Sequence, residues 1–278
     1  MSAAVETSAP ASPAGGLWAA VRARLAIVAL LFVLAAIAWW STADRMADMD
    51  AGPGTDLGTL GWFVGIWVVM MAAMMFPSVS PTVALYSRMS RERDAVAPLL
   101  FAVGYLAVWS AAGVAAYGVF RAGRALLGDQ LAWDQGGRWL AGGTLLVAAA
   151  YELTPLKDVC LAKCRTPLGY LMGSWRSGRG GALRMGAGHG AWCLGCCWAL
   201  MAALFALGVM SLVWTAVVAA VIALEKTLPY KRVATWGVAA FLVVLAIGVM
   251  AFPHDVPGLT VPDSSDAMKA MDSMQMTP

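Results

Sequence analysis

The sequence predicts an all-α membrane protein, a polytopic bundle of about seven transmembrane helices. Of its 278 residues, 60% are hydrophobic and 13% are charged, whereas soluble domains average about 45–50% apolar and about 25% charged residues. Its mean hydropathy is +0.72, and apolar stretches long enough to cross a bilayer recur along the chain. These observations exclude a soluble globular enzyme, a disordered protein and a disulfide-stapled secreted module.

Seven apolar segments are predicted to span the bilayer, namely 20–40, 60–76, 98–120, 139–153, 184–207, 209–224 and 233–252. A single helix over 184–224 would be about 60 Å long, twice the hydrocarbon thickness, so a hairpin at Gly208 is predicted instead. Residues 1–19 and 253–278 are predicted to be flexible ends, which leaves 20–252 as one transmembrane domain.

The distribution of charge predicts the orientation. Most of the 19 basic residues fall in 22–24, 88–93, 157–184 and 226–232, all on one side of a seven-span topology. The first loop on the other side and the C-terminal tail are acidic. The positive-inside rule therefore predicts a cytoplasmic N-terminus and a periplasmic C-terminus in a bacterial inner membrane. The same sorting explains the net charge of +3 without a nucleic-acid partner, and the lipid bilayer is a predicted partner.

The fifth span carries the clearest candidate metal ligands. At 100° per residue, His189, Cys193, Cys196 and Cys197 lie within one face of a helix. Imidazole and thiolate are ligands of Zn(II) and copper. The alternative is that these cysteines act as small apolar residues at a helix contact. Three cysteines together with one of only two histidines in the chain favour a metal site.

The second span carries four methionines, Met70, Met71, Met74 and Met75. They stack at i, i+4 spacing, and thioethers are neutral, soft ligands that suit Cu(I). Flexible filling of gaps between helices is the alternative role. At the predicted depths, these methionines and the fifth-span cysteines lie in the same half of the bilayer, so the two sets could form one site.

Two further cysteines, Cys160 and Cys164, follow the fourth span at i, i+4 spacing. If the segment is helical, they share a face, and the neighbouring Lys157, Lys163 and Arg165 would lower their pKa. They are predicted to bind metal or to be reactive thiolates, with ordinary free thiols as the alternative. Glu152 is either a ligand or an ion-pair partner of Lys157, and Glu225 is a weaker candidate of the same kind.

The C-terminal tail contains the spaced methionines Met268, Met271, Met274 and Met276. In a polar segment they have no core to fill, which favours capture of Cu(I) over a plain solvated tail. All five cysteines lie on the predicted cytoplasmic side or within the membrane, which argues against an enzyme that makes disulfides on the oxidising side.

Four motifs occur in order: Trp-x-x-Met-x-x-Ala-Met-Met-x-Pro (67–77), Tyr-x-x-Thr-Pro-Leu-Lys-x-x-Cys-Leu-x-x-Cys-Arg (151–165), Gly-x-x-His-Gly-x-x-Cys-x-Gly-Cys-Cys-Trp (186–198) and Glu-Lys-x-x-Pro (225–229). In these motifs, which cover roughly residues 60–230, the chain resembles a bacterial family of predicted metal-binding integral membrane proteins of unknown function. The resemblance implies a bacterial source and a metal site. Relatives of this kind commonly carry Gln at the position of Glu152, which implies that this residue need not be a ligand.

We predict a metal-binding inner-membrane protein that handles Cu(I), with Zn(II) as the alternative metal. Transport, storage, and delivery to a cuproprotein or a periplasmic metal carrier remain open. The sequence has no nucleotide-binding loop, so ATP-driven pumping by this chain alone is not expected.

The sequence also fits two other classes of membrane protein. One is a thiol- or metal-dependent membrane oxidoreductase that uses Cys196 and Cys197 beside a quinone or haem. The other is an assembly subunit whose small residues, Gly186, Gly188, Gly190 and Gly195, pack against another membrane protein.

Overall fold

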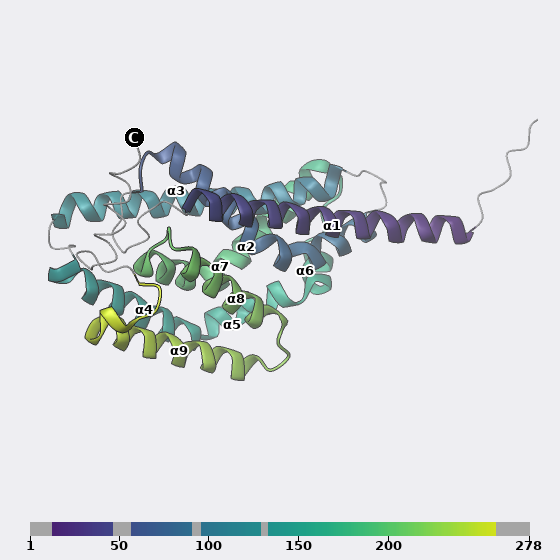
Figure 1. The fold of residues 1–278 in the computed structure, drawn as a ribbon. Helices are drawn as coiled ribbons and strands as arrows, with labels where there is room; N and C mark the ends of the chain where they lie inside the picture. Colours follow the sequence, from purple (N-terminus) through teal and green to yellow (C-terminus); the bar gives the residue numbers. More distant parts are fainter. Residues whose placement is uncertain (1–12, 47–56, 91–95, 129–132, 260–278) are drawn as a thin grey trace, which may run out of the picture.

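The chain folds as a bundle of α-helices (Figure 1). The computed structural model describes residues 13–46, 57–90, 96–128 and 133–259. Within them the α-helices are α1 (Pro13–Met46), α2 (Leu60–Met89), α3 (Val96–Leu127), α4 (Arg138–Glu152), α5 (Pro155–Arg165), α6 (Pro167–Gly173), α7 (Gly178–Leu207), α8 (Leu212–Thr227) and α9 (Lys231–Ala251). A π-helical turn, η2 (Trp133–Gly137), precedes α4, and a 3-10 turn, η3 (Pro253–Asp255), follows α9. The predicted all-α class is confirmed.

Five of the described helices are long and apolar enough to cross a membrane, and they lie at Leu25–Met46, Leu60–Met89, Val96–Leu127, Gly178–Leu207 and Arg232–Ala251. The chain is therefore a multi-pass membrane protein. The other two predicted spans form α4, with 15 residues, and α8, with 16 residues. At 1.5 Å per residue these helices are about 22–24 Å long, short of the about 30 Å hydrocarbon layer. Five of the seven predicted spans therefore correspond to helices long enough to cross a membrane, while the full span count and the orientation stay predictions.

Several helices extend beyond the predicted spans, α1 and α2 by the largest margin. α1 begins at Pro13, before the expected start at residue 20. α2 continues through Pro77 and Pro81 to Met89, although the predicted span ended at residue 76. A proline removes one backbone donor from a helix, and here the Ser80 hydroxyl donates to the Pro77 carbonyl at 2.9 Å. The carbonyl that would have bonded the missing amide of Pro81 therefore keeps a partner.

α7 is the central helix, because α3, α4, α5 and α8 all pack against it. α1 lies along α2 and extends beyond the rest of the bundle at one end, while α9 lies beside α4 on the opposite side (Figure 1). The buried core runs through these contacts and includes Trp67, Trp109 and Tyr105, each at most 2% exposed.

Glycines allow α3 and α7 to approach closely. A Cβ atom on Gly186 would lie 1.9 Å from the Phe101 carbonyl oxygen, and one on Gly104 would lie 2.1 Å from the Leu183 carbonyl oxygen. Close backbone contact at small residues is the usual way in which membrane helices associate.

The remaining glycines of the predicted small-residue face also pack within this chain. Gly190 faces the Tyr105 backbone, Gly188 faces the Tyr170 hydroxyl, and Gly195 faces the Cys160 sulfur. The small-residue face that suggested an assembly subunit is therefore used internally.

Replacing Gly186 with alanine should separate α3 from α7. The added methyl group has no space, and overpacking of this kind costs about 1–3 kcal/mol. The matched control is Gly118→Ala in α3, where no atom lies within 4 Å of the added carbon. Thermal unfolding of the detergent-solubilised protein, followed with a thiol-reactive fluorophore, should show a lower midpoint for Gly186→Ala only. Equal midpoints for the two variants would contradict this account of the α3–α7 contact.

Candidate metal centre

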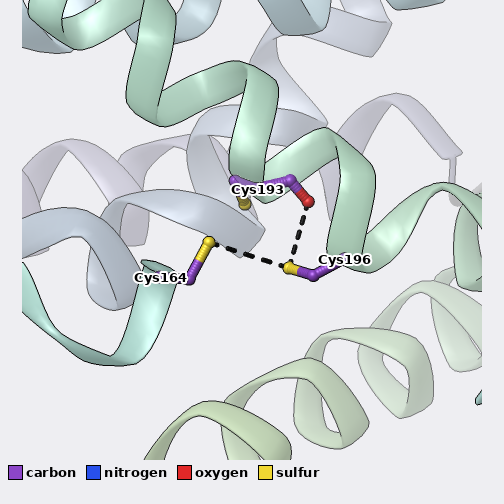
Figure 2. Close-up of side chains that lie close together, drawn as sticks. All are labelled: Cys164, Cys193 and Cys196. Atoms are coloured by element: carbon purple, nitrogen blue, oxygen red, sulfur yellow. Dashed lines mark hydrogen bonds between the residues drawn. The ribbon is translucent and has the colours of Figure 1, made fainter. Parts of the chain in front are cut away.

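Three cysteine sulfurs converge between α7 and α5. Cys193 and Cys196 are three residues apart on α7 and share its inner face, and Cys164 comes from the last turn of α5 (Figure 2). The three Sγ atoms lie within 4.8 Å of one another, and those of Cys164 and Cys196 are 3.8 Å apart. All three side chains are buried, and their thiols are free.

These separations fit a single soft metal ion. Sulfurs about 2.3 Å from a common ion lie about 3.8–4.0 Å from one another. In the described part of the chain, this is the one group of three or more His, Cys, Asp or Glu side chains close enough to hold an ion. A set made only of cysteines selects Cu(I) or Zn(II) over hard cations such as Mg²⁺.

Cys193 also has two polar neighbours that the sequence analysis missed. The Tyr105 hydroxyl of α3 donates to the Cys193 sulfur at 2.9 Å. The Lys226 ammonium, at the end of α8, donates to the same sulfur at 3.1 Å and to the Ser78 hydroxyl at 3.2 Å. Lys226 is half-buried, so its charge acts on Cys193 with limited screening by solvent. The one signal in the sequence was its place in the Glu-Lys-x-x-Pro motif.

The other predicted ligands lie around this cluster, outside the three-sulfur set. The Cys197 sulfur is 3.3 Å from that of Cys196. Cys160 is buried against Gly195, one turn of α5 before Cys164. The His189 ring packs among aromatic rings, with its centroid 4.9 Å from that of Tyr170, and its buried Nδ1 has no hydrogen-bond partner in the described residues.

The methionines of α2 are buried, as a ligand or a core residue would be. Met70, Met71, Met74 and Met75 are each at most 5% exposed. The Met70 sulfur lies 3.8 Å from the Thr215 hydroxyl of α8, which donates to the Ser211 carbonyl at 2.8 Å. The prediction that these thioethers join the cysteines in one site stays a prediction. The predicted tail motif, Met268 to Met276, lies outside the described residues.

A buried ion-pair triad joins α5 to α4 and α8. The Lys157 ammonium of α5 contacts the Glu152 carboxylate at the end of α4 and lies 2.7 and 2.8 Å from the two carboxylate oxygens of Glu225 in α8. All three side chains are at most 2% exposed. Arg165, at the other end of α5, donates to the Glu225 carbonyl at 3.1 Å and also to the Leu228 carbonyl. Glu152 and Glu225 are therefore ion-pair partners in this structure.

The prediction that basic neighbours lower the pKa of Cys160 and Cys164 on α5 is wrong. Hydrogen bonding to Cys193 raises the pKa of Cys164, and burial raises the pKa of Cys160. Two of the basic side chains that were expected to favour thiolates, Lys157 and Arg165, are engaged elsewhere. Burial alone would lower the pKa of Lys157, but its contacts with Glu225 and Glu152 outweigh that effect and raise it.

Removing the shared cation should loosen α5. Lys157→Met leaves two carboxylates buried without a counter-charge, which costs about 3–5 kcal/mol. The control is Glu152→Gln, in which Lys157 keeps both contacts with Glu225. We expect the thiol-reactive fluorophore to label Cys164 much faster in Lys157→Met than in Glu152→Gln or the wild type. Similar labelling rates in all three proteins would show that the triad does not hold Cys164 in place.

Comparison with known proteins agrees with the chemistry of this site. Residues 64–249 match the copper chaperone family PpoB2. No curated protein and no solved structure shows a significant match to the chain. The family match includes Cys164, Cys193 and Cys196 together with the helices that hold them. Because it also covers more than half of the sequence, this chain belongs to the copper chaperone family PpoB2.

Proposed function

We propose that the protein carries one Cu(I) ion as cargo on Cys164, Cys193 and Cys196 and delivers it to a copper-dependent protein. The observation that carries this proposal is the convergence of three buried sulfurs within 4.8 Å in a member of a copper chaperone family. In this proposal the protein acts in a bacterial inner membrane, and its acceptor is a cuproprotein or a periplasmic metal carrier.

The number and type of ligands favour Cu(I) over Zn(II). Structural zinc is almost always bound by four ligands in a tetrahedron, and in the described residues no His, Asp or Glu side chain completes the three-cysteine set. Cu(I) is soft and is favoured by thiolates. A site with three sulfur donors therefore suits a monovalent copper cargo.

Lys226 supplies charge compensation. Three thiolates and one Cu(I) carry a net charge of −2, and burying such a charge without a partner is costly. The Lys226 ammonium lies 3.1 Å from the Cys193 sulfur and reduces the net charge to −1. The Tyr105 hydroxyl, 2.9 Å from the same sulfur, adds a hydrogen bond to an anionic acceptor.

The remaining predicted ligands form an outer set in this proposal. Cys197 and Cys160 neighbour the cluster, and the four α2 methionines supply thioethers. His189 has a buried nitrogen that finds no partner among the residues the structure describes. We assign these residues to the path of the ion toward or away from the three cysteines, and the C-terminal methionines to capture.

Anaerobic titration of the purified protein with Cu(I) against a competing chelator tests the site. Cys164→Ser, Cys193→Ser and Cys196→Ser should each weaken Cu(I) binding by at least about tenfold, because each removes one of three soft ligands. Cys160→Ser is the matched control, a buried cysteine on α5 outside the cluster, and should retain the wild-type affinity. X-ray absorption of the loaded wild-type protein should show copper bound by three sulfurs.

Zinc bound in preference to copper, or an equal loss of affinity in Cys160→Ser, would contradict this assignment. Thermal midpoints of all four variants, measured without metal, separate a lost ligand from a lost fold.

The role of Lys226 is tested by changing its charge. Lys226→Met keeps a long side chain but removes the cation, so Cu(I) affinity should fall by about tenfold or more, since the net charge of the loaded site becomes −2. Lys226→Arg should retain most of the affinity. If Lys226→Met bound Cu(I) more tightly than the wild type, the ammonium would be a competitor of the ion and the charge argument would be wrong.

A further inference from the structure

One surface at the end of the bundle is strongly positive. The structure describes every residue from 150 to 190, and Asp158 is the one exposed acid in this stretch, because Glu152 is buried against Lys157. The exposed basic side chains of the same stretch are Lys163, Arg176, Arg179 and Arg184. We call this surface, together with the exposed Arg88 in the last turn of α2, the basic face. Its excess of positive charge attracts anions.

Exposed apolar side chains lie among these charges. On α6, Leu168 and Met172 are one turn apart and are 52% and 68% exposed, and Trp175, which follows α6, is 38% exposed. α5 and α6 have 11 and 7 residues, too few to cross a bilayer. In Figure 1, α6 lies at the end of the bundle toward which α1 extends. Short helices that expose apolar and basic side chains together are typical of segments that lie in the membrane interface.

The order of side chains along α5 gives the direction from hydrocarbon to headgroup. The exposed Leu156, Val159 and Lys163 fall within about 60° of one another around the helix. Leu156 and Val159 come first, next to the end of α4, and Lys163 comes one turn later, next to α6. Interfacial lysines lay their stems along apolar surface and place their charge at the headgroups. α5 therefore leads out of the hydrocarbon layer toward the basic face.

Contacts with α7 hold this segment against the bundle. The Tyr170 hydroxyl of α6 donates to the Met185 carbonyl of α7 at 2.6 Å. The Arg176 backbone N–H donates to the Met185 sulfur at 3.2 Å. Arg184 directly precedes Met185, so the two arginines come from adjacent parts of the basic face.

A second contact joins the segment to α2. The Trp175 and Tyr86 rings are stacked at a tilt, with their centroids 5.6 Å apart. Arg88 follows Tyr86 by two residues, and Arg176 follows Trp175 directly. Two helices and the loop before α7 therefore bring arginines to one preformed surface, which a ligand does not have to order when it binds.

We propose that the basic face binds the headgroups of anionic phospholipids. In this arrangement Arg88, Arg176 and Arg184 pair with phosphate oxygens, for which the planar guanidinium group is well shaped. Trp175 lies at the headgroup level, as tryptophans at membrane interfaces do. Clusters of basic residues beside membrane helices attract anionic lipids in this way. The proposal goes beyond the copper cargo and does not depend on it.

An acidic protein could also pair with the arginines, but the apolar side chains favour lipid. α4 exposes Val147 and Leu153, which are 59% and 45% exposed on the outside of a membrane protein. The exposed Leu156 and Val159 of α5 follow them along the chain. The lipid that covers α4 therefore reaches the edge of the basic face.

Energy transfer from tryptophan to a phospholipid with a pyrene-labelled acyl chain tests this proposal in the full-length protein in detergent. Phosphatidylglycerol, which is anionic, is the probe, and zwitterionic phosphatidylcholine with the same chains is its control. The wild type should bind phosphatidylglycerol more tightly, and added salt should weaken this preference by screening. Arg176→Gln and Arg184→Gln should each lower phosphatidylglycerol affinity by about fivefold, the effect of one basic side chain at an anionic surface. Phosphatidylcholine affinity should not change.

Arg45→Gln is the matched control. Arg45 is exposed in the last turn of α1, beside the exposed Asp44, and lies away from the end of the bundle that holds α6 (Figure 1). It should bind both lipids like the wild type, and Arg176→Lys, which keeps the charge, should retain most of the phosphatidylglycerol affinity.

Equal binding of the two lipids by the wild type would overturn the proposal and leave an acidic protein as the occupant of the basic face. An equal loss of phosphatidylglycerol affinity in Arg45→Gln and Arg176→Gln would also overturn it, because net charge alone would then explain binding. Since all the replaced side chains are exposed, thermal midpoints should match that of the wild type. Cu(I) affinity should be unchanged in every variant, so failure here is distinguishable from failure of the copper assignment.

Discussion

The close contact of α3 and α7 is the constraint on which the candidate metal centre depends. Gly104, Gly186 and Gly190 bring the two backbones so near that a Cβ on Gly186 would lie 1.9 Å from a carbonyl oxygen of α3. Tyr105 follows Gly104 directly, and its hydroxyl therefore reaches Cys193 at 2.9 Å. A bulkier residue at any of these glycines would push α3 away from α7. The Tyr105 hydroxyl would then lose its contact with the Cys193 sulfur, even though the cysteines of α7 would keep their positions relative to one another.

The second half of the centre depends on buried charge. α5 is an 11-residue helix that is too short to cross the membrane, so apolar burial in lipid cannot fix its position. The contacts of Lys157 with Glu152 and Glu225 join α5 to α4 and α8, and Arg165 adds bonds to carbonyls at the end of α8. A buried ion pair is a poor source of net stability, but breaking one is costly because it leaves an uncompensated buried charge. These contacts hold α5 where the Cys164 sulfur lies 3.8 Å from that of Cys196.

The sequence predicted the parts of the site that follow from helical periodicity, and missed those that depend on tertiary packing. Cys193 and Cys196 share a face of α7 because of their spacing alone. That Cys164 meets them, and that Cys160 does not, depends on how α5 folds back against α7. The contacts of Lys226 and Tyr105 with Cys193 join helices far apart in sequence, so no local pattern reveals them. The length of α4 and α8 was missed for a different reason, because hydropathy identifies apolar segments but does not fix where a helix begins and ends.

α7 presents different chemistry on neighbouring faces. Cys193 and Cys197 are four residues apart and lie on the side of the sulfur cluster. Leu194 and Trp198, each one residue later, line an apolar cavity of about 620 Å³ between α3, α4 and α7. A step of one residue turns an α-helix by 100°, so one continuous helix separates the two environments without a loop. The Tyr151 hydroxyl donates to the Gly195 carbonyl at 2.5 Å, and its ring meets that of Trp198 edge-on at 4.9 Å. A displacement of α4 would therefore reach the cavity wall through Trp198 and the backbone beside Cys196 together.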